Sequence, residues 1–444
     1  MVSQSTEAKK KGIVWNVLWK EEDWWAVWLG FFLILLTIIG VLVKPTLPSK
    51  WGREPGEGIL SSIPLDAIPG ILLTGLIVFV IFAAANKIMG RDVGRFATGF
   101  PVVFLLAILA YLLGNYAPLR HYGFNEVIWA LVLGLLISNT IRTPAFMQKA
   151  VLTEMYIKTG LVLLGASILF DRMLVLGMYG LGVAWAVTPV VVIFMYWFSQ
   201  KILKMHENRG LAITISASTS VCGVSAAIAA GTAAKAKKEE ITLAISITLI
   251  FTVLMMIGMP AFIALVGIDP IVGGAWIGGT IDSTGAVVAA GAMLGPEAME
   301  TAAVIKMIQN ILIGVIAFCV AVFWVIVYEK GTASGAAIQS GPKEIWVRMP
   351  KFIIGFVAAS LVFSFLIPGT AVDEHLGVIK GYRVLFFVLA FVSIGLESNF
   401  KDMAKMVRGG KPLILYIIGQ SFNLILTLIA AWIFFSGRFF PPVF

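Results

Sequence analysis

The sequence predicts an all-α polytopic membrane protein, built from inverted repeats with two discontinuous or re-entrant helices at the membrane midplane. Three observations predict this class. Of the 444 residues, 59% are hydrophobic and only 13% are charged, whereas a soluble domain has roughly 25% charged residues. Apolar segments of about 20 residues, long enough to cross a bilayer, recur along the chain. Two of the segments are instead rich in small and hydroxyl-bearing residues.

Thirteen apolar segments follow one another along the chain, which predicts about 11–13 membrane segments. They run approximately over 24–43, 68–88, 99–117, 124–139, 154–170, 173–198, 211–234, 238–267, 271–294, 299–328, 352–367, 381–397 and 412–436. Because no small-residue cleavage site follows the first segment, we expect a retained helix and not a signal peptide. The predicted parts are a cytoplasmic N-terminal tail (1–23), N-terminal spans (24–123), a first inverted repeat (124–267), a second inverted repeat (268–436) and a C-terminal tail (437–444).

The distribution of basic residues predicts how the chain is oriented. Because the N-terminal tail carries several lysines, we expect it on the cytoplasmic side. Alternation from there places Lys235, Lys237 and Lys238 outside if segment 211–234 crosses the membrane, against the positive-inside rule. A re-entrant hairpin would return this loop to the cytoplasm, and 271–294 would then dip in from the opposite side. The alternative is a pair of unwound helices that cross the membrane.

A weak internal repeat supports the hairpin interpretation. Residues 164–173 read LGASILFDRM, and residues 393–403 read SIGLESNFKDM. In the hairpin topology these two segments run in opposite directions, so they would be inverted copies. Each half of a hairpin would be about 11 residues, or roughly 16 Å, which is about half the hydrocarbon thickness. The two tips would therefore meet near the midplane.

The two hydroxyl-rich segments are the best candidates for a binding site. Residues 214–231 read TISASTSVCGVSAAIAAG, and residues 278–291 read GGTIDSTGAVVAAG. A matched pair of polar, irregular segments at membrane depth indicates a transporter site. Glycine would allow a turn with positive φ, and free N–H groups at the start of a half-helix would favour an anion. The predicted substrate ligands are Ser218, Thr219, Ser220, Cys222, Gly223, Ser225, Thr280, Ser283, Thr284 and Gly285. Alternatively, these small residues only allow close helix packing in lipid.

Two charged residues within apolar segments sharpen this prediction. Asp282 could bind Na⁺, carry a proton or cap a half-helix. Lys306, about eight residues into segment 299–328, could attract an anionic substrate, pair with Asp282 or snorkel to the interface. We place Lys306 with the substrate-binding residues, and we assign ion coupling to Asp282 and Asn310.

The two motifs resemble those of the YeiH-like family of membrane proteins, which carries a sulfate-exporter label. The resemblance rests on SVCGVSAAIAA (220–230) followed by KAKKEE (235–240), and on GTIDSTGAVVAAG (279–291) followed by VIK (304–306). It implies distant similarity to cation–proton antiporters and bile-acid symporters, whose inverted repeats would favour crossed broken helices. Where the family commonly has a His-Glu pair, this chain has Asp282-Ser283, which could favour Na⁺ or another coupling over proton handling.

We expect a secondary active transporter of a small anion, of the sulfate, sulfonate or carboxylate type, in a bacterial cytoplasmic membrane. The alternatives are a Na⁺/H⁺ antiporter that uses Asp282 and an anion channel. The sequence offers no nucleophile–base set, P-loop or metal cluster, so we expect no enzyme, no metal and no cofactor besides Na⁺ or H⁺ as a coupling ion. The lysines and arginines behind the net charge of +9 are expected to lie in cytoplasmic loops. The expected partners are the anion and the lipid bilayer, with no nucleic acid; the chain is compatible with a homodimer.

Overall fold

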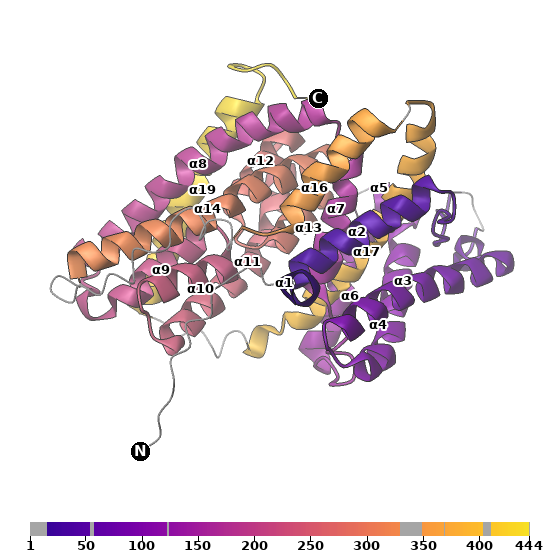
Figure 1. The fold of residues 1–444 in the computed structure, drawn as a ribbon, viewed down its shortest axis with the longest axis horizontal. Coiled ribbons are helices and arrows are strands. Elements are labelled where there is room, and N and C mark those ends of the chain that lie inside the picture. Colours follow the sequence, from indigo (N-terminus) through magenta and orange to yellow (C-terminus); the bar gives the residue numbers. More distant parts are fainter. Residues whose placement is uncertain are drawn as a thin grey trace.

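The computed structural model describes residues 16–53, 57–121, 124–328, 349–367, 369–402 and 410–443. These residues form helices and loops without a strand, which confirms the all-α prediction (Figure 1). The helices are α1 (Asn16–Lys20), α2 (Glu22–Ile38), α3 (Ile68–Ile88), α4 (Val93–Gly114), α5 (Ala117–His121), α6 (Glu126–Thr140), α7 (Thr153–Ser167), α8 (Phe170–Lys201), α9 (Arg209–Ser220), α10 (Gly223–Ala233), α11 (Lys238–Val266), α12 (Pro270–Thr280), α13 (Thr284–Leu294), α14 (Pro296–Tyr328), α16 (Phe352–Leu361), α17 (Gly369–Glu397) and α19 (Lys411–Phe435). Residues 1–15 of the predicted N-terminal tail lie outside the described residues.

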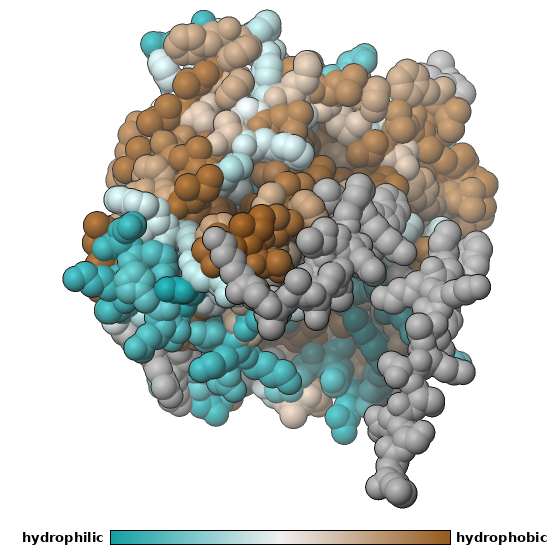
Figure 2. Space-filling view, turned by 60° about the vertical axis from the view of Figure 1, so that its left-hand side comes forward, coloured by the Kyte–Doolittle hydropathy of each residue, from teal (hydrophilic) through white to brown (hydrophobic). Residues whose placement is uncertain are grey.

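Within the described residues, seven helices are long and apolar enough to cross a membrane, and the protein is a multi-pass membrane protein. They are Leu65–Ile88, Val93–Gly114, Phe170–Lys201, Lys238–Val266, Pro296–Tyr328, Val372–Glu397 and Lys411–Phe435. Each of the thirteen predicted segments contains a helix or a pair of helices. Figure 2 shows apolar side chains over the upper part of the visible face and hydrophilic side chains gathered below them.

The largest difference from the predicted segments concerns α17. This helix begins at Gly369, whereas the apolar segment begins at residue 381. The added turns carry charged residues such as Asp373 and Lys380, which hydropathy assigns to a loop. Ile379 is nevertheless buried, and Leu376 and Val378 pack against the core, so packing extends α17 beyond its apolar part.

Several helices begin where the sequence supplies a polar cap. Asp92, Asn125 and Asp269 each accept a hydrogen bond from a backbone N–H in the first turn of α4, α6 and α12. Such caps satisfy N–H groups that have no partner within the helix. By contrast, no side chain caps the start of α10 or α13.

The chain doubles back at both hydroxyl-rich segments. A Cβ placed on Gly210, at the start of α9, would lie 3.0 Å from the Cα of Ala236, just after α10. In the second segment, a Cβ on Gly273 near the start of α12 would lie 3.2 Å from the Leu294 side chain at the end of α13. The two halves of each segment therefore lie side by side, as hairpins. The crossed helices that the distant family resemblance favoured are not observed in this part of the chain.

Helices α7 and α17 pack against each other and run antiparallel. At one end, Thr153 Oγ1 donates a hydrogen bond to Glu397 Oε2 at 2.9 Å. At the other end, Arg383 Nη1 donates to Ser167 Oγ at 2.7 Å. When the two repeat sequences are aligned, Thr153 falls on Arg383 and Ser167 falls on Glu397. The two contacts therefore occupy equivalent positions in the aligned sequences.

A second pair of contacts recurs in the same way. Ser360 Oγ of α16 donates to the main-chain oxygen of Ile168 at the end of α7, at 2.5 Å. Ser138 Oγ of α6 donates to the main-chain oxygen of Ser398 at the end of α17, at 2.9 Å. Helix α16 thus contacts α7 in the way that α6 contacts α17.

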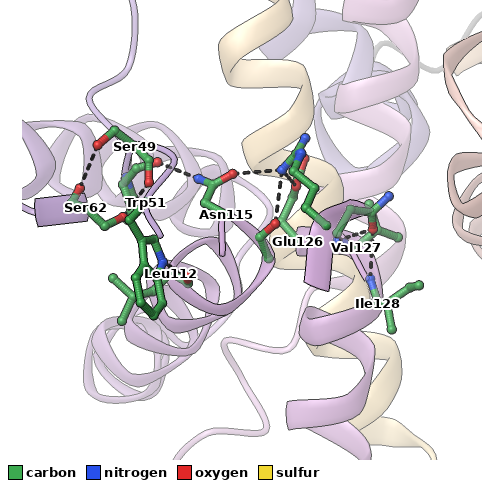
Figure 3. Close-up of polar contacts among 12 residues, drawn as sticks. Ser49, Trp51, Ser62, Leu112, Asn115, Glu126, Val127 and Ile128 are labelled. Atoms are coloured by element: carbon green, nitrogen blue, oxygen red, sulfur yellow. Dashed lines mark hydrogen bonds and ion pairs between the residues drawn. The ribbon is translucent and has the colours of Figure 1, made fainter. Parts of the chain in front are cut away.

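A polar network ties the segment before α3 to the ends of α4 and α6 (Figure 3). Asn115 Nδ2 donates to the main-chain oxygen of Pro48 at 2.6 Å, and Asn115 Oδ1 accepts from Arg120 at 2.8 Å. Arg120 also forms an ion pair with Glu126 at 2.7 Å. Because Asn115 is buried, its bonds form away from competing water.

Replacing Asn115 by alanine is expected to lower the free energy of unfolding by about 1–3 kcal/mol, the cost of leaving buried polar groups unpaired. Unfolding of the purified protein in detergent, followed by circular dichroism, measures this loss. Thr98→Ala is the control, because the exposed Thr98 hydroxyl bonds only within its own helix. Equal unfolding midpoints for both variants would show that the network does not stabilise the fold.

Candidate functional site

The tips of the two hairpins meet. The N–H of Gly223 donates to the main-chain oxygen of Asp282 at 2.6 Å. Cys222 and Ser283 have extended backbone, with φ of −152° and −134°, and each leads into the next half-helix. The prediction that glycine turns the tips through positive φ is therefore wrong. Gly223 instead provides space, since a Cβ there would lie 2.5 Å from Cγ2 of Thr248 in α11.

Side chains from neighbouring helices cap the carbonyl ends of α9 and α12, the half-helices that lead into the tips. Gln309 of α14 lies between them, and its Nε2 donates to the main-chain oxygens of Ser220 and Gly279, both at 3.0 Å. Gln420 of α19 donates to the main-chain oxygen of Thr280 at 3.1 Å. These amides satisfy carbonyl groups that have no partner within their own helix. They also hold the two tips against α14 and α19.

Lys306 is fully buried in α14, with 1% of its surface exposed. Its Nζ donates to the main-chain oxygen of Val221 and to Gln309 Oε1, the latter at 2.6 Å. Among the described residues, no carboxylate lies within 4.0 Å of this ammonium group. Lys306 therefore does not snorkel to the interface, and it forms no direct ion pair with Asp282, although the two charges lie within electrostatic range of each other. A cation is favourable at the C-terminal end of α9, yet a buried charge without a counterion in direct contact remains costly.

Asp282 is also buried, and its Oδ2 accepts a hydrogen bond from the Tyr416 hydroxyl at 2.7 Å. It does not cap α13, because Ser283 occupies the N-cap position and no side chain makes a cap bond; this predicted role is wrong. Asn310 Nδ2 donates to Thr284 Oγ1 at 3.0 Å, which leaves Asn310 Oδ1 buried without a partner. The start of α13 thus has a carboxylate and a free amide oxygen close by, both of which can bind a cation.

The hydroxyls of α9 do not converge on the tips. Ser218 and Thr219 donate to the main-chain oxygen of Ile215, and Ser220 donates to that of Ser216, at 2.6–2.9 Å. Back-bonding of this kind uses the hydroxyl protons inside the helix. Ser225 is exposed on α10. These four residues are therefore less suited to donate to a substrate at the tips than the sequence predicted.

The first turns of α10 and α13 keep free N–H groups at the tips. Regular helix bonding begins with Ala226 N–H to Cys222 O in α10 and with Val287 N–H to Ser283 O in α13. The preceding N–H groups, except those of Gly223 and of Ser225, which lies against the Cys222 thiol, have no partner among the described residues, and helix N-termini of this kind favour anions. The predicted residues that the structure brings together at or beside the tips are Cys222, Gly223, Thr280, Asp282, Ser283, Thr284, Gly285, Lys306 and Asn310.

Two side chains at the tips were missed in the sequence prediction. Tyr416 binds Asp282, and Thr188 of α8 donates to the main-chain oxygen of Ser220 at 3.2 Å. Tyr416 shares a face of α19 with Gln420 and Asn423, so the helical spacing of polar residues in an apolar segment was the available signal. In the described part of the chain, no group of three His, Cys, Asp or Glu side chains could hold a metal ion.

Comparison with known proteins gives family matches over most of the chain. Residues 98–416 match the model of the family described as conserved hypothetical protein 698. A UPF0324 membrane protein of Rhodopirellula baltica is 53% identical over 409 residues, which cover 90% of this chain and 74% of that protein. One of Nitratidesulfovibrio vulgaris is 52% identical, over 80% of this chain and 62% of that protein. The chain thus spans 62–74% of the length of these relatives.

A more distant relative is matched over most of its length. The UPF0324 membrane protein TauZ of Paracoccus denitrificans is 28% identical over 330 residues, which cover 71% of this chain and 90% of that protein. No solved structure matches. The matches confirm the family to which the two hydroxyl-rich motifs pointed.

Proposed function

We propose that this chain, which belongs to the family of conserved hypothetical protein 698, the UPF0324 membrane proteins, is a secondary transporter of a small anion. One observation carries the proposal: two hairpin tips meet among apolar helices, with the buried Lys306 at one tip and uncapped helix N-termini at both. An anion with several oxygen atoms would pair with the ammonium group and accept from the free N–H groups. Sulfate, a sulfonate or a carboxylate fits this description.

The equivalent contacts of α7 and α17 support two inverted repeats, at residues 124–267 and 268–436. Two antiparallel helices that exchange equivalent contacts are related by a two-fold axis, which is the symmetry of inverted-topology transporters. Binding sites in such transporters lie near the midplane at broken helices. We infer that the meeting point of the two tips is such a site and that access to it alternates between the two sides of the membrane.

We also infer an orientation for the protein in the bacterial cytoplasmic membrane. If the hairpin α9–α10 enters from the cytoplasm, the loop with Lys235, Lys237 and Lys238 lies inside, in agreement with the positive-inside rule. Alternation of the earlier spans then places the N-terminal tail inside as well. Hairpin α12–α13 enters from the opposite side.

Coupling to an ion gradient is the part of the mechanism we assign to Asp282. A buried carboxylate in a membrane protein is costly and is usually retained for function. Asp282 and the free Asn310 Oδ1 are acceptors for Na⁺, and Asp282 with Tyr416 could instead hold a proton. No catalytic role is proposed for any of these residues.

Uptake by proteoliposomes tests the proposed function. We expect saturable uptake of at least one of sulfate, isethionate and succinate, driven by a Na⁺ or pH gradient, and counterflow when the same anion is preloaded. An anion channel would conduct without saturation or counterflow. A Na⁺/H⁺ antiporter, which the buried Asp282 makes the second candidate, would dissipate a pH gradient on addition of Na⁺ with no anion present. Either result, or the absence of any anion flux, would contradict the proposal.

A further inference from the structure

A buried arginine lies at the end of the α7–α17 pair opposite Glu397. Arg383 is 3% exposed. Its Nη1 donates to Ser167 Oγ at 2.7 Å, while its Nε is buried and has no hydrogen-bond partner among the described residues. No described carboxylate lies within 4.0 Å of the guanidinium group. Arg383 therefore carries a buried positive charge that the protein itself does not neutralise by contact.

The acidic residue that acts on Arg383 electrostatically is Glu300, near the start of α14. It lies within electrostatic range of Arg383 but does not form an ion pair with it. Arg172 of α8 and Lys380 of α17 act on the same carboxylate, as does the acid Glu297. Glu300 is thus shared among three basic groups and leaves the guanidinium with unused donors.

The guanidinium group of Arg383, unpaired among the described residues, is suited to bind an oxyanion. An arginine stays charged at any physiological pH, and its planar fork of N–H groups matches the oxygens of a carboxylate, sulfonate or sulfate. A buried donor without a partner and a buried charge without a counterion both destabilise the folded protein. In a membrane protein, such residues commonly mark the path of a substrate or an ion.

The other end of the α7–α17 pair carries acidic side chains in place of the arginine. There, Glu397 takes the position that corresponds to Ser167, and it is exposed, in contrast to the buried Arg383. Glu154 of α7 lies within electrostatic range of Glu397, and its side chain is 52% exposed. An anion would be repelled at this acidic end and attracted at the arginine end.

We propose that Arg383 forms a second oxyanion site, separate from the hairpin tips and at the end of α7–α17 opposite Glu397. Ser167 positions the guanidinium group by accepting its hydrogen bond, since the Ser167 hydroxyl itself donates to the main-chain oxygen of Leu164 at 3.0 Å. The site takes a small anion with at least two oxygens on one centre, which bind Arg383 in place of the absent carboxylate. This inference rests on the proposed function, because the anion that occupies the site is the transported one.

Four variants in the full chain test this site by proteoliposome uptake of sulfate, isethionate and succinate. Arg383→Gln is expected to raise KM roughly 10- to 100-fold, the factor for a lost charge-assisted bond. Arg383→Lys keeps the charge but not the fork, so its KM should fall between those of Arg383→Gln and the wild type. Ser167→Ala should raise KM less than Arg383→Gln does. Glu300→Gln should leave KM unchanged or lower it, because the carboxylate competes with the anion for Arg383.

The outcomes separate this inference from the proposed function. If the wild type takes up none of the three anions, the proposed function fails. If the wild type transports and Arg383→Gln has the wild-type KM, only the second site fails. A rise in KM for Glu300→Gln equal to that for Arg383→Gln would show that the arginine serves as a partner of Glu300, and would overturn the site. Should Arg383→Gln not fold, a wild-type KM for Arg383→Lys together with a raised KM for Glu300→Gln overturns it equally.

Discussion

Transport of the anion by a Lys306→Met variant is expected to fall about 30-fold or more below the wild-type rate. The substitution keeps the length and apolar stem of the side chain and removes the buried charge that faces the hairpin tips. The charge pair that is lost is the proposed one between Lys306 and the bound anion. Removing one member of a buried, hydrogen-bonded charge pair costs about 2–5 kcal/mol, and about 1.4 kcal/mol corresponds to a factor of ten. Uptake by proteoliposomes, with protein content matched by immunoblot, measures this loss.

The same variant distinguishes a binding role for Lys306 from a structural one. Methionine leaves the Val221 carbonyl and Gln309 Oε1 without their donor, but it also relieves the cost of a buried charge. We therefore expect an unfolding midpoint close to that of the wild type. Gln309→Leu is the matched control in the next turn, because it removes the bonds to Ser220 and Gly279 and should lower the midpoint. Wild-type uptake by Lys306→Met would show that Lys306 does not bind the anion and only caps the end of α9.

The hairpins could be predicted from sequence because charge constrains topology. Lys235, Lys237 and Lys238 conflict with a crossing segment, and only a chain that doubles back removes the conflict. The start of α17 could not be predicted in this way. Its first turns carry charged residues, and they are helical because another face of the same turns packs on the core: Ile379 is buried, and Leu376 and Val378 pack against the core.

The candidate site was predictable in its location and less so in its contacts. The hydroxyl-rich composition placed the site at the tips, but composition does not tell where a hydroxyl points. Ser218, Thr219 and Ser220 bond within α9, whereas Tyr416 reaches Asp282 from a helix near the other end of the chain. The repeat equivalence of Arg383 and Thr153 likewise became meaningful only once the contacts at both ends of α7 and α17 were known.

Replacing Asp282 by asparagine is expected to abolish ion-driven accumulation of the anion while leaving counterflow in place. Asparagine preserves the shape of the side chain and an acceptor for the Tyr416 hydroxyl, but it removes the charge that would bind Na⁺ or H⁺. Counterflow exchanges one anion for another and requires no net movement of the coupling ion. We therefore expect the accumulation ratio to fall to its value without a gradient, measured in proteoliposomes with an imposed Na⁺ or pH gradient.

Two further variants show which ion is coupled. Tyr416→Phe keeps the carboxylate and loses its 2.7 Å hydrogen bond, so coupling should persist with an altered dependence on pH. Asn310→Leu removes the free Oδ1 and should weaken Na⁺-driven accumulation if Na⁺ is the coupling ion, but should leave proton-driven accumulation intact. If Asp282→Asn still accumulates the anion against its gradient, coupling must reside elsewhere. The buried carboxylate would then serve to hold the second tip to α19 through Tyr416.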